Sequence, residues 1–185
     1  MCYYYPLANG WTRFIVTVNK QRVAALLRRA PWIGALGQMV YRRWQPWMTA
    51  GVVGAILNDQ CQVLLVEHVF HPKFPWGFPG GWMSRREDPE DTIRREALEE
   101  TGLSIEVLKP LVVMTATYVH NHLDIAYLCY APDTRGVRLS NELLAYRWCQ
   151  PEALVDVRLS LFHHHVACAA LDEIRAGAFA RKIGG

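Results

Sequence analysis

The stretch GGWMSRREDPEDTIRREALEETGL, residues 80–103, places five Glu, two Asp and four Arg between glycines. Neighbouring carboxylates repel one another. At about 5 to 6 Å a pair costs on the order of 1 kcal/mol in water and about 3 kcal/mol at an effective dielectric of 20. A helix that needed only solubility would intersperse lysine, so this density of acidic residues calls for a chemical reason.

The ends of a helix can be read within this stretch. Asp88 is a good N-cap residue, Pro89 suits the first helical position, and Gly102 is a natural terminator. Asp91, three residues after the cap, adds a further start signal. The sequence therefore predicts a helix from Pro89 to Thr101.

Three glutamates share one face of that helix. Glu96, Glu99 and Glu100 are spaced i, i+3 and i+4, which confines them to an arc of about 100°. A hard divalent cation such as Mg²⁺ or Mn²⁺ would remove their repulsion, because it prefers oxygen ligands. The alternative is a solvated acidic face paired to Arg94 and Arg95.

The residues around this helix predict an α+β domain with a mixed sheet, because strands surround helices without regular βαβ repetition. AGVVGAIL and CQVLLVEH are predicted to be two strands joined at Asn58–Gln60, and HPKFPWGFPGG is predicted to be a loop. Further strands are expected within 104–120, 123–131 and 144–149, and a closing helix within 161–177. The domain is expected to span residues 49–185.

Residues 1–48 are expected to form a basic, Trp-rich extension. The first 50 residues contain seven Lys or Arg and no Asp or Glu, whereas the remainder has 13 basic against 17 acidic residues. Residues 11–18 suggest a strand, and 21–30 a helix that Pro31 ends, followed by an apolar segment, 32–44. The extension fits a helix docked on its own domain or contact with an anionic partner. A weak anionic membrane contact, a homodimer contact and a lid also fit; no DNA partner is indicated.

Composition excludes several classes. The five cysteines are odd in number and scattered, never in C-x-x-C spacing, which disfavours a disulfide framework or a structural zinc site. No secretory signal and no membrane-spanning run are expected. A cytoplasmic location is the resulting expectation.

The spacing of the charged stretch resembles the Nudix box, G-x5-E-x7-R-E-U-x-E-E-x-G-U with U apolar. Gly81, Glu87, Arg95, the three glutamates above and Gly102 supply all seven specified residues, and Ala97 and Leu103 occupy the apolar positions. The resemblance covers about residues 49–155. It implies an α/β/α sandwich around a mixed sheet.

The resemblance also implies an activity: hydrolysis of a diphosphate in a nucleoside diphosphate linked to another moiety, by water attack at phosphorus. It assigns Mg²⁺ or Mn²⁺ to Glu96, Glu99 and Glu100, with a backbone carbonyl of Gly80 or Gly81 as a further ligand. Alternatives are a non-catalytic nucleotide or metabolite sensor and an isopentenyl diphosphate isomerase, for which Cys61 is poorly placed. The linked moiety stays open, although the absence of a PQGG form disfavours RNA and dinucleoside polyphosphates.

The resemblance further implies roles for residues around the metal ligands. Glu87 and Arg95 match a pair that holds the loop against the helix. Glu142, six residues before Trp148, is the first candidate for the general base, with Glu99 the rival. His120 and His122 lack a third zinc ligand, and His163, His164 and His165 fit ordinary helix positions. Substrate contacts by base stacking or phosphate binding are considered for Lys73, Trp76, Phe78, Arg85 and Arg86, with core packing or solvent exposure as the alternative.

Overall fold

An apolar strand, β1 (Thr49–Leu57), forms the centre of the sheet in this computed structural model, which describes residues 20–45, 47–116 and 119–177. The predicted strand over residues 11–18 lies outside the described residues. β1 runs parallel to β6 (His122–Tyr130) along its whole length and antiparallel to β2 (Val63–His68). Near-continuous burial from Val52 onward explains its apolar sequence, because helices cover both faces.

The described residues form a sheet of seven strands in the order β3-β2-β1-β6-β5, with β4 paired to β1 and β7 to β2. The further strands are β3 (Trp76–Gly77), β4 (Gly80–Trp82), β5 (Glu106–Thr115) and β7 (Leu143–Cys149). β3 and the first two residues of β4 lie in the segment predicted to be a loop. That prediction was wrong because these short Gly/Pro-containing strands exist through pairing with distant residues rather than through local propensity.

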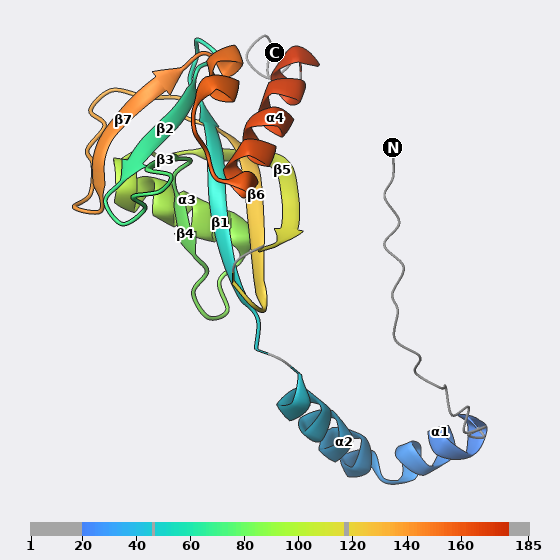
Figure 1. The fold of residues 1–185 in the computed structure, drawn as a ribbon. Helices are drawn as coiled ribbons and strands as arrows, with labels where there is room; N and C mark the ends of the chain where they lie inside the picture. Colours follow the sequence, from blue (N-terminus) through green and yellow to red (C-terminus); the bar gives the residue numbers. More distant parts are fainter. Residues whose placement is uncertain (1–19, 46, 117–118, 178–185) are drawn as a thin grey trace, which may run out of the picture. The chain divides into compact units, whose positions relative to one another are not determined.

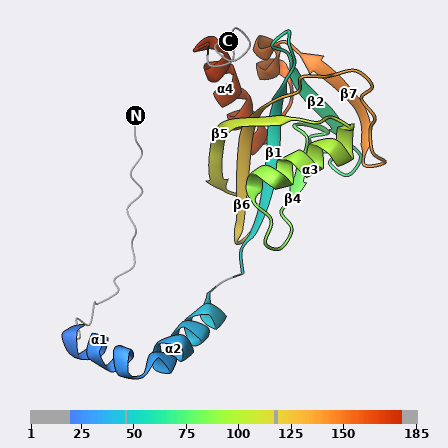
Figure 2. The same cartoon turned by 180° about the vertical axis from the view of Figure 1, so that it is seen from behind.

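Two helices cover opposite faces of the sheet, α3 (Pro89–Thr101) and α4 (Leu161–Arg175) (Figures 1 and 2). Ile93 and Ala97 of α3 belong to one buried cluster, and Val166 and Ala170 of α4 belong to the other. A 3₁₀ helix, η1 (Pro151–Asp156), precedes α4. The predicted fold class, α+β with an α/β/α sandwich and a mixed sheet, is confirmed.

The helix α3 has the predicted bounds, although one cap differs from the expected chemistry. Gly102 adopts the left-handed conformation at φ 73°, and its N–H donates to the Leu98 carbonyl. Asp88 holds the N-cap position without a side-chain hydrogen bond to the helix. The start of α3 therefore depends on Pro89 and the acidic first turn rather than on an Asp88 cap.

The chain divides into two compact units, Met1–Pro46 and Trp47–Gly185. The described part of the first unit consists of α1 (Lys20–Arg29) and α2 (Pro31–Trp44). Within the described residues, no helix is both long and apolar enough to span a bilayer.

Candidate active site

The glutamate face of α3 is aimed at β4. Burial of Ile93 and Ala97 fixes the helix on the sheet, and Glu100, one turn further on, is only 7% exposed. Its Oε2 accepts a hydrogen bond from the Gly80 N–H at 2.9 Å. This contact joins the end of the acidic helix to the short strand that precedes it.

Gly81 leaves room for the second glutamate. A Cβ atom at Gly81 would lie 2.5 Å from the carboxylate carbon and Oε1 of Glu96. Any larger residue at position 81 would displace the Glu96 carboxylate, so the glycine that opens the charged motif has a steric role.

Burial and mutual repulsion change the acidity of these carboxyls. Removal from water, together with the neighbouring charges of Glu96, Glu142 and Glu99 and against the hydrogen bond from the Gly80 N–H, raises the pKa of Glu100 to about 7. Burial also raises the pKa of Glu96. Such a cluster is costly for folding and favours a cation.

Arg95 organises the exposed side of the cluster. Its guanidinium donates to both oxygens of Glu87, at 2.8 and 3.0 Å, and to Glu96 at 2.8 Å and Glu99 at 3.2 Å. The hydrogen bond from Arg95, with a second from the Ser84 N–H, lowers the pKa of Glu87 to about 2. Glu87 and Arg95 thus pin the β4–α3 loop to the helix.

A cleft of about 560 Å³ opens beside these residues. Glu142, exposed in the segment just before β7, lines the same cleft although it lies more than 40 residues from α3. The structure therefore brings together five of the residues selected from the sequence: Gly80, Glu96, Glu99, Glu100 and Glu142.

Another wall of the cleft contains residues that the sequence did not single out as a site. Trp82, Gly51 and Asp124 are direct neighbours across β4, β1 and β6. The nearly buried His122 lies against Trp82, with the two rings tilted by 51° and their centroids 4.7 Å apart, and its Nε2 is 3.3 Å from Asp124 Oδ1. One signal could have revealed this wall: Asp124 is the only charge in the apolar strand segment LDIAYLCYA.

Two histidines at the end of the cleft were also missed as site residues. His163 of α4 accepts the Phe78 N–H at its Nδ1, 3.2 Å away, so it is more than an ordinary helix position. Nε2 of His68 is buried and has no hydrogen-bond partner. Burial, reinforced by neighbouring histidines, lowers the pKa of His68 to about 4 and that of His163 to about 3.

These histidines predict acid instability. Because both are held neutral in the fold, they contribute stability that is fully present above pH 6.5, where the unfolded state also stays neutral, and that is lost as the pH falls toward 4. In that window each histidine lowers the free energy of unfolding by about 1.4 kcal/mol for every unit by which the pH falls. Urea unfolding of His163→Gln between pH 6 and 4.5 should show a slope smaller by about that amount. The exposed His165→Gln should keep the wild-type slope; equal slopes for all three proteins would contradict the assignment.

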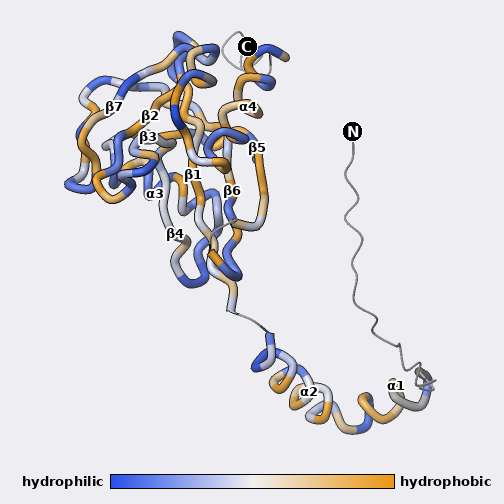
Figure 3. Tube along the Cα trace, in the orientation of Figure 1, coloured by the Kyte–Doolittle hydropathy of each residue, from blue (hydrophilic) through white to orange (hydrophobic). Residues whose placement is uncertain are grey.

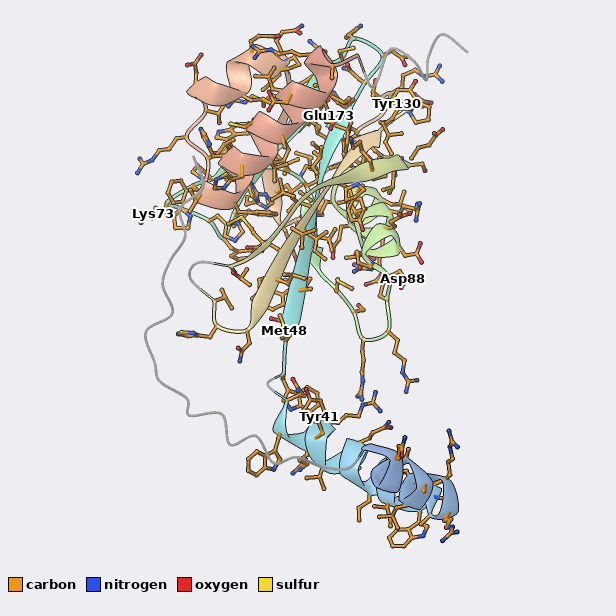
Figure 4. The ribbon with its side chains drawn as sticks, turned by 90° about the vertical axis from the view of Figure 1, so that its right-hand side faces the viewer. Tyr41, Met48, Lys73, Asp88, Tyr130 and Glu173 are labelled. Atoms are coloured by element: carbon orange, nitrogen blue, oxygen red, sulfur yellow. The ribbon has the colours of Figure 1, made fainter. Side chains whose placement is uncertain are left out.

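The substrate candidates lie mostly outside this cleft. Phe78 lines it but is 1% exposed and belongs to the core, so base stacking by Phe78 is corrected to core packing. The Arg147 guanidinium lies 4.3 Å from the centroid of the Trp76 ring. Both residues line a separate hollow, which Lys73 also lines. Figure 4 shows Lys73 on the far side of the domain from Asp88 at the start of α3. Arg85 and Arg86 are exposed in the β4–α3 loop and do not line the cleft.

The donor set of the cleft fits a hard divalent cation by its chemistry, since every candidate ligand is an oxygen and most are anionic. As the side chains stand, no three described His, Cys, Asp or Glu residues are grouped closely enough to hold an ion. Glu96 and Glu99 are instead hydrogen-bonded to Arg95. Binding a cation there would require these two carboxylates to turn from the guanidinium.

Comparison with known proteins identifies one family, whose model matches most of the domain. The model of the NUDIX domain matches residues 47–169. A MutT-like protein of Streptomyces ambofaciens is 28% identical over 109 residues, which are 58% of this chain and 67% of that protein.

A further relative and a solved structure match this chain over different shares of their length. The human protein named nucleoside diphosphate-linked moiety X motif 6 is 31% identical over 108 residues, covering 56% of this chain but only 32% of that protein. Among solved structures, the NUDIX domain of Shewanella oneidensis NrtR, complexed with ADP ribose, aligns with a TM-score of 0.58 at 20% identity, covering 71% of this chain and 92% of that one.

Proposed function

We propose, on the premise that this chain belongs to the NUDIX family, that it is a metal-dependent pyrophosphohydrolase. Its substrate would be a nucleoside diphosphate linked to another moiety, cleaved by attack of water at phosphorus. The observation that carries the proposal is the convergence of Glu96, Glu99, Glu100 and Glu142 on one cleft.

The carboxylates supply what a diphosphate requires. Glu96, Glu99 and Glu100, with a backbone carbonyl of Gly80 or Gly81, would hold Mg²⁺ or Mn²⁺. Such an ion neutralises phosphate charge and lowers the pKa of a bound water. Arg95 and Glu87 position the helix and loop, and the Gly80 N–H orients Glu100.

A general base is needed to take the proton from the attacking water. We assign this role first to Glu142, because it is exposed to solvent, lines the cleft and raises the pKa of Glu100 by its charge. Glu99 is the alternative, being exposed on α3 beside the same cleft.

Replacing each candidate base by Gln distinguishes Glu142 from Glu99. Glu142→Gln should lower kcat about a hundredfold and remove the acidic limb of the kcat–pH profile, since Gln cannot accept a proton. The exposed Glu152, which does not line the cleft, provides a matched Glu→Gln control with wild-type kcat. A wild-type profile in Glu142→Gln, with the limb lost in Glu99→Gln, would transfer the role to Glu99.

The wall formed by Trp82, Gly51, His122 and Asp124 is the place we assign to the linked moiety. The exposed Trp82 ring offers a stacking surface, and the Asp124 carboxylate accepts hydrogen bonds from hydroxyl or amino groups. Gly51 leaves room for the His122 ring, since a Cβ at this position would lie 3.1 Å from His122 Nε2. A nucleoside or sugar hydroxyl edge fits this chemistry.

The test is a panel of diphosphate compounds assayed with Mg²⁺, Mn²⁺ or EDTA. Nucleoside triphosphates, nucleotide sugars, ADP-ribose and dinucleotides would be incubated with the full chain, and products identified by mass and by phosphate release after phosphatase treatment. Metal-dependent cleavage at the diphosphate is expected for at least one class. If a compound raises the melting temperature yet none is cleaved, the chain is a non-catalytic sensor of that compound instead.

Metal binding should also be visible without substrate. Millimolar Mg²⁺ or Mn²⁺ should raise the melting temperature by roughly 5 to 10 °C, because a ligand at about 100 times its Kd stabilises the fold by about 2.7 kcal/mol. Glu100→Gln should lose most of this rise, whereas Glu90→Gln, exposed in the first turn of α3, should keep it. An undiminished shift in Glu100→Gln would count against the ligand assignment.

A homodimer and a cytoplasmic location remain predictions for this chain, to be checked by analytical ultracentrifugation and by fractionation.

A further inference from the structure

The two helices of the extension present apolar faces to solvent. In α2, Trp32, Leu36, Met39 and Val40 are spaced i, i+4, i+7 and i+8, which places them on one side of the helix. Each is more than half exposed, from Leu36 at 53% to Met39 at 68%. In α1, Leu26 and Leu27 are likewise exposed. Figure 3 shows hydrophobic and hydrophilic positions alternating along both helices.

These helices lack a packed core of their own. None of the described residues before Val52 is buried, and α2 contains no buried residue. The two helices approach one another at Gly34, where an added Cβ would lie 3.5 Å from the end of Leu27. Short helices gain most of their stability from packing an amphipathic face, so this face calls for a covering surface.

The charges of the extension identify that surface as anionic. Arg28 and Arg29 lie away from the Leu26–Leu27 side of α1. Arg42 flanks the apolar side of α2, about 100° from its centre, and Arg43 extends that side into the last turn. No ion pair joins Arg28, Arg29, Arg42 or Arg43 to a carboxylate in the part of the chain that the structure describes. A second copy of this face would bring like charges together, because the first 50 residues contain no acidic residue at all.

Aromatic residues further favour a lipid interface over a protein groove. Trp44 is 86% exposed, and Tyr41, labelled in Figure 4, is 66% exposed. Trp and Tyr gather at membrane–water interfaces, where one end of the ring is apolar and the other is polar. The 14 residues of α2 extend about 21 Å, less than the roughly 30 Å hydrocarbon core, so the helix would lie on a bilayer rather than cross it.

We propose that α1 and α2 bind the surface of an anionic lipid membrane, their apolar faces entering the headgroup boundary and their arginines contacting lipid phosphates. This is the combination that holds amphipathic basic helices on anionic bilayers. The proposal does not depend on the hydrolase activity, and its test uses no substrate.

The test is sedimentation of the full chain with vesicles of phosphatidylcholine alone or with 30% phosphatidylglycerol. Binding is expected only to the anionic vesicles and should weaken in 0.5 M salt. Arg42→Gln/Arg43→Gln should lower the partition coefficient about thirtyfold, at roughly fivefold per arginine near the surface. Trp32→Ser/Leu36→Ser/Met39→Ser should abolish binding at either salt concentration.

The matched control is Arg85→Gln/Arg86→Gln, an exposed consecutive pair in the β4–α3 loop with the same change of charge. This control should bind vesicles as the wild type does. Three results would overturn the proposal. The first is no binding to anionic vesicles, and the second is an equal loss of binding in the control pair. The third is an apolar-face variant that still binds vesicles, together with a dimer in ultracentrifugation that the wild type forms and the variant does not.

Discussion

Replacing Glu100 by Gln should lower kcat about a thousandfold, which corresponds to about 4 kcal/mol of transition-state stabilisation. Gln keeps the shape of the side chain and can still accept the Gly80 N–H, but it removes the negative charge that sits deepest in the glutamate cluster. Since a metal ligand acts through charge, the loss should appear in kcat rather than in folding. Glu99→Gln is expected to show a loss of similar size.

The stability of the Glu100→Gln variant distinguishes a lost ligand from a lost fold. The folded pKa of Glu100, about 7, lies above its ordinary value of 4.5 because the carboxyl is buried. Its ionisation therefore opposes folding: the contribution of Glu100 to the free energy of unfolding is fully present below pH 4.5 and is lost as the pH rises through 7. In EDTA at pH 8, Glu100→Gln should be at least as stable as the wild type.

Glu90→Gln is the control for the kinetic prediction, because Glu90 lies on the same helix, is exposed and pairs with Arg94 rather than facing the cleft. It should retain wild-type kcat. Near-wild-type turnover in Glu100→Gln would remove this residue from the catalytic machinery. A loss of turnover accompanied by unfolding in EDTA would show that Glu100 is needed for structure instead.

Local signals explain why α3 was predicted with its bounds. Pro89, Gly102 and the periodicity of Ile93 and Ala97 all act within one helix, so the sequence carries them directly. The same locality allowed the Glu96–Glu99–Glu100 face to be predicted. The steric role of Gly81 could not be derived in this way, because it depends on how closely β4 approaches α3.

The missed parts of the site depend on long-range pairing. Asp124 reaches the cleft only because β6 pairs in parallel with β1 and β4 pairs on the other side. His163 reaches it from the last helix, and Phe78 is withdrawn into the core between them. Substrate candidates chosen for residue type near the motif, such as Lys73, Arg85 and Arg86, consequently fell outside the cleft.

The largest expected effect on stability is that of Gly80→Ala. The backbone at Gly80 has φ 153°, which an L side chain rarely adopts, and an added Cβ would collide with the Val52 carbonyl oxygen and lie 2.6 Å from the Val53 Cα. Both neighbours are backbone of the central strand β1, so neither can move without disturbing the sheet. The free energy of unfolding should fall by about 4 kcal/mol, the sum of conformational strain and displaced packing.

Two glycine controls separate the causes of this loss in urea unfolding. Gly136→Ala also changes a positive-φ glycine, at 76°, but its Cβ would meet nothing within 4 Å, so it should cost only about 1 kcal/mol. Gly81→Ala collides with the flexible end of Glu96, which can move aside; its stability should fall less than that of Gly80→Ala, while its turnover falls sharply. Equal losses of stability at Gly80 and Gly136 would mean that strain alone acts at Gly80 and that β4 is not pressed against β1. In that case Glu100 would lose the structural basis for its contact with the Gly80 N–H.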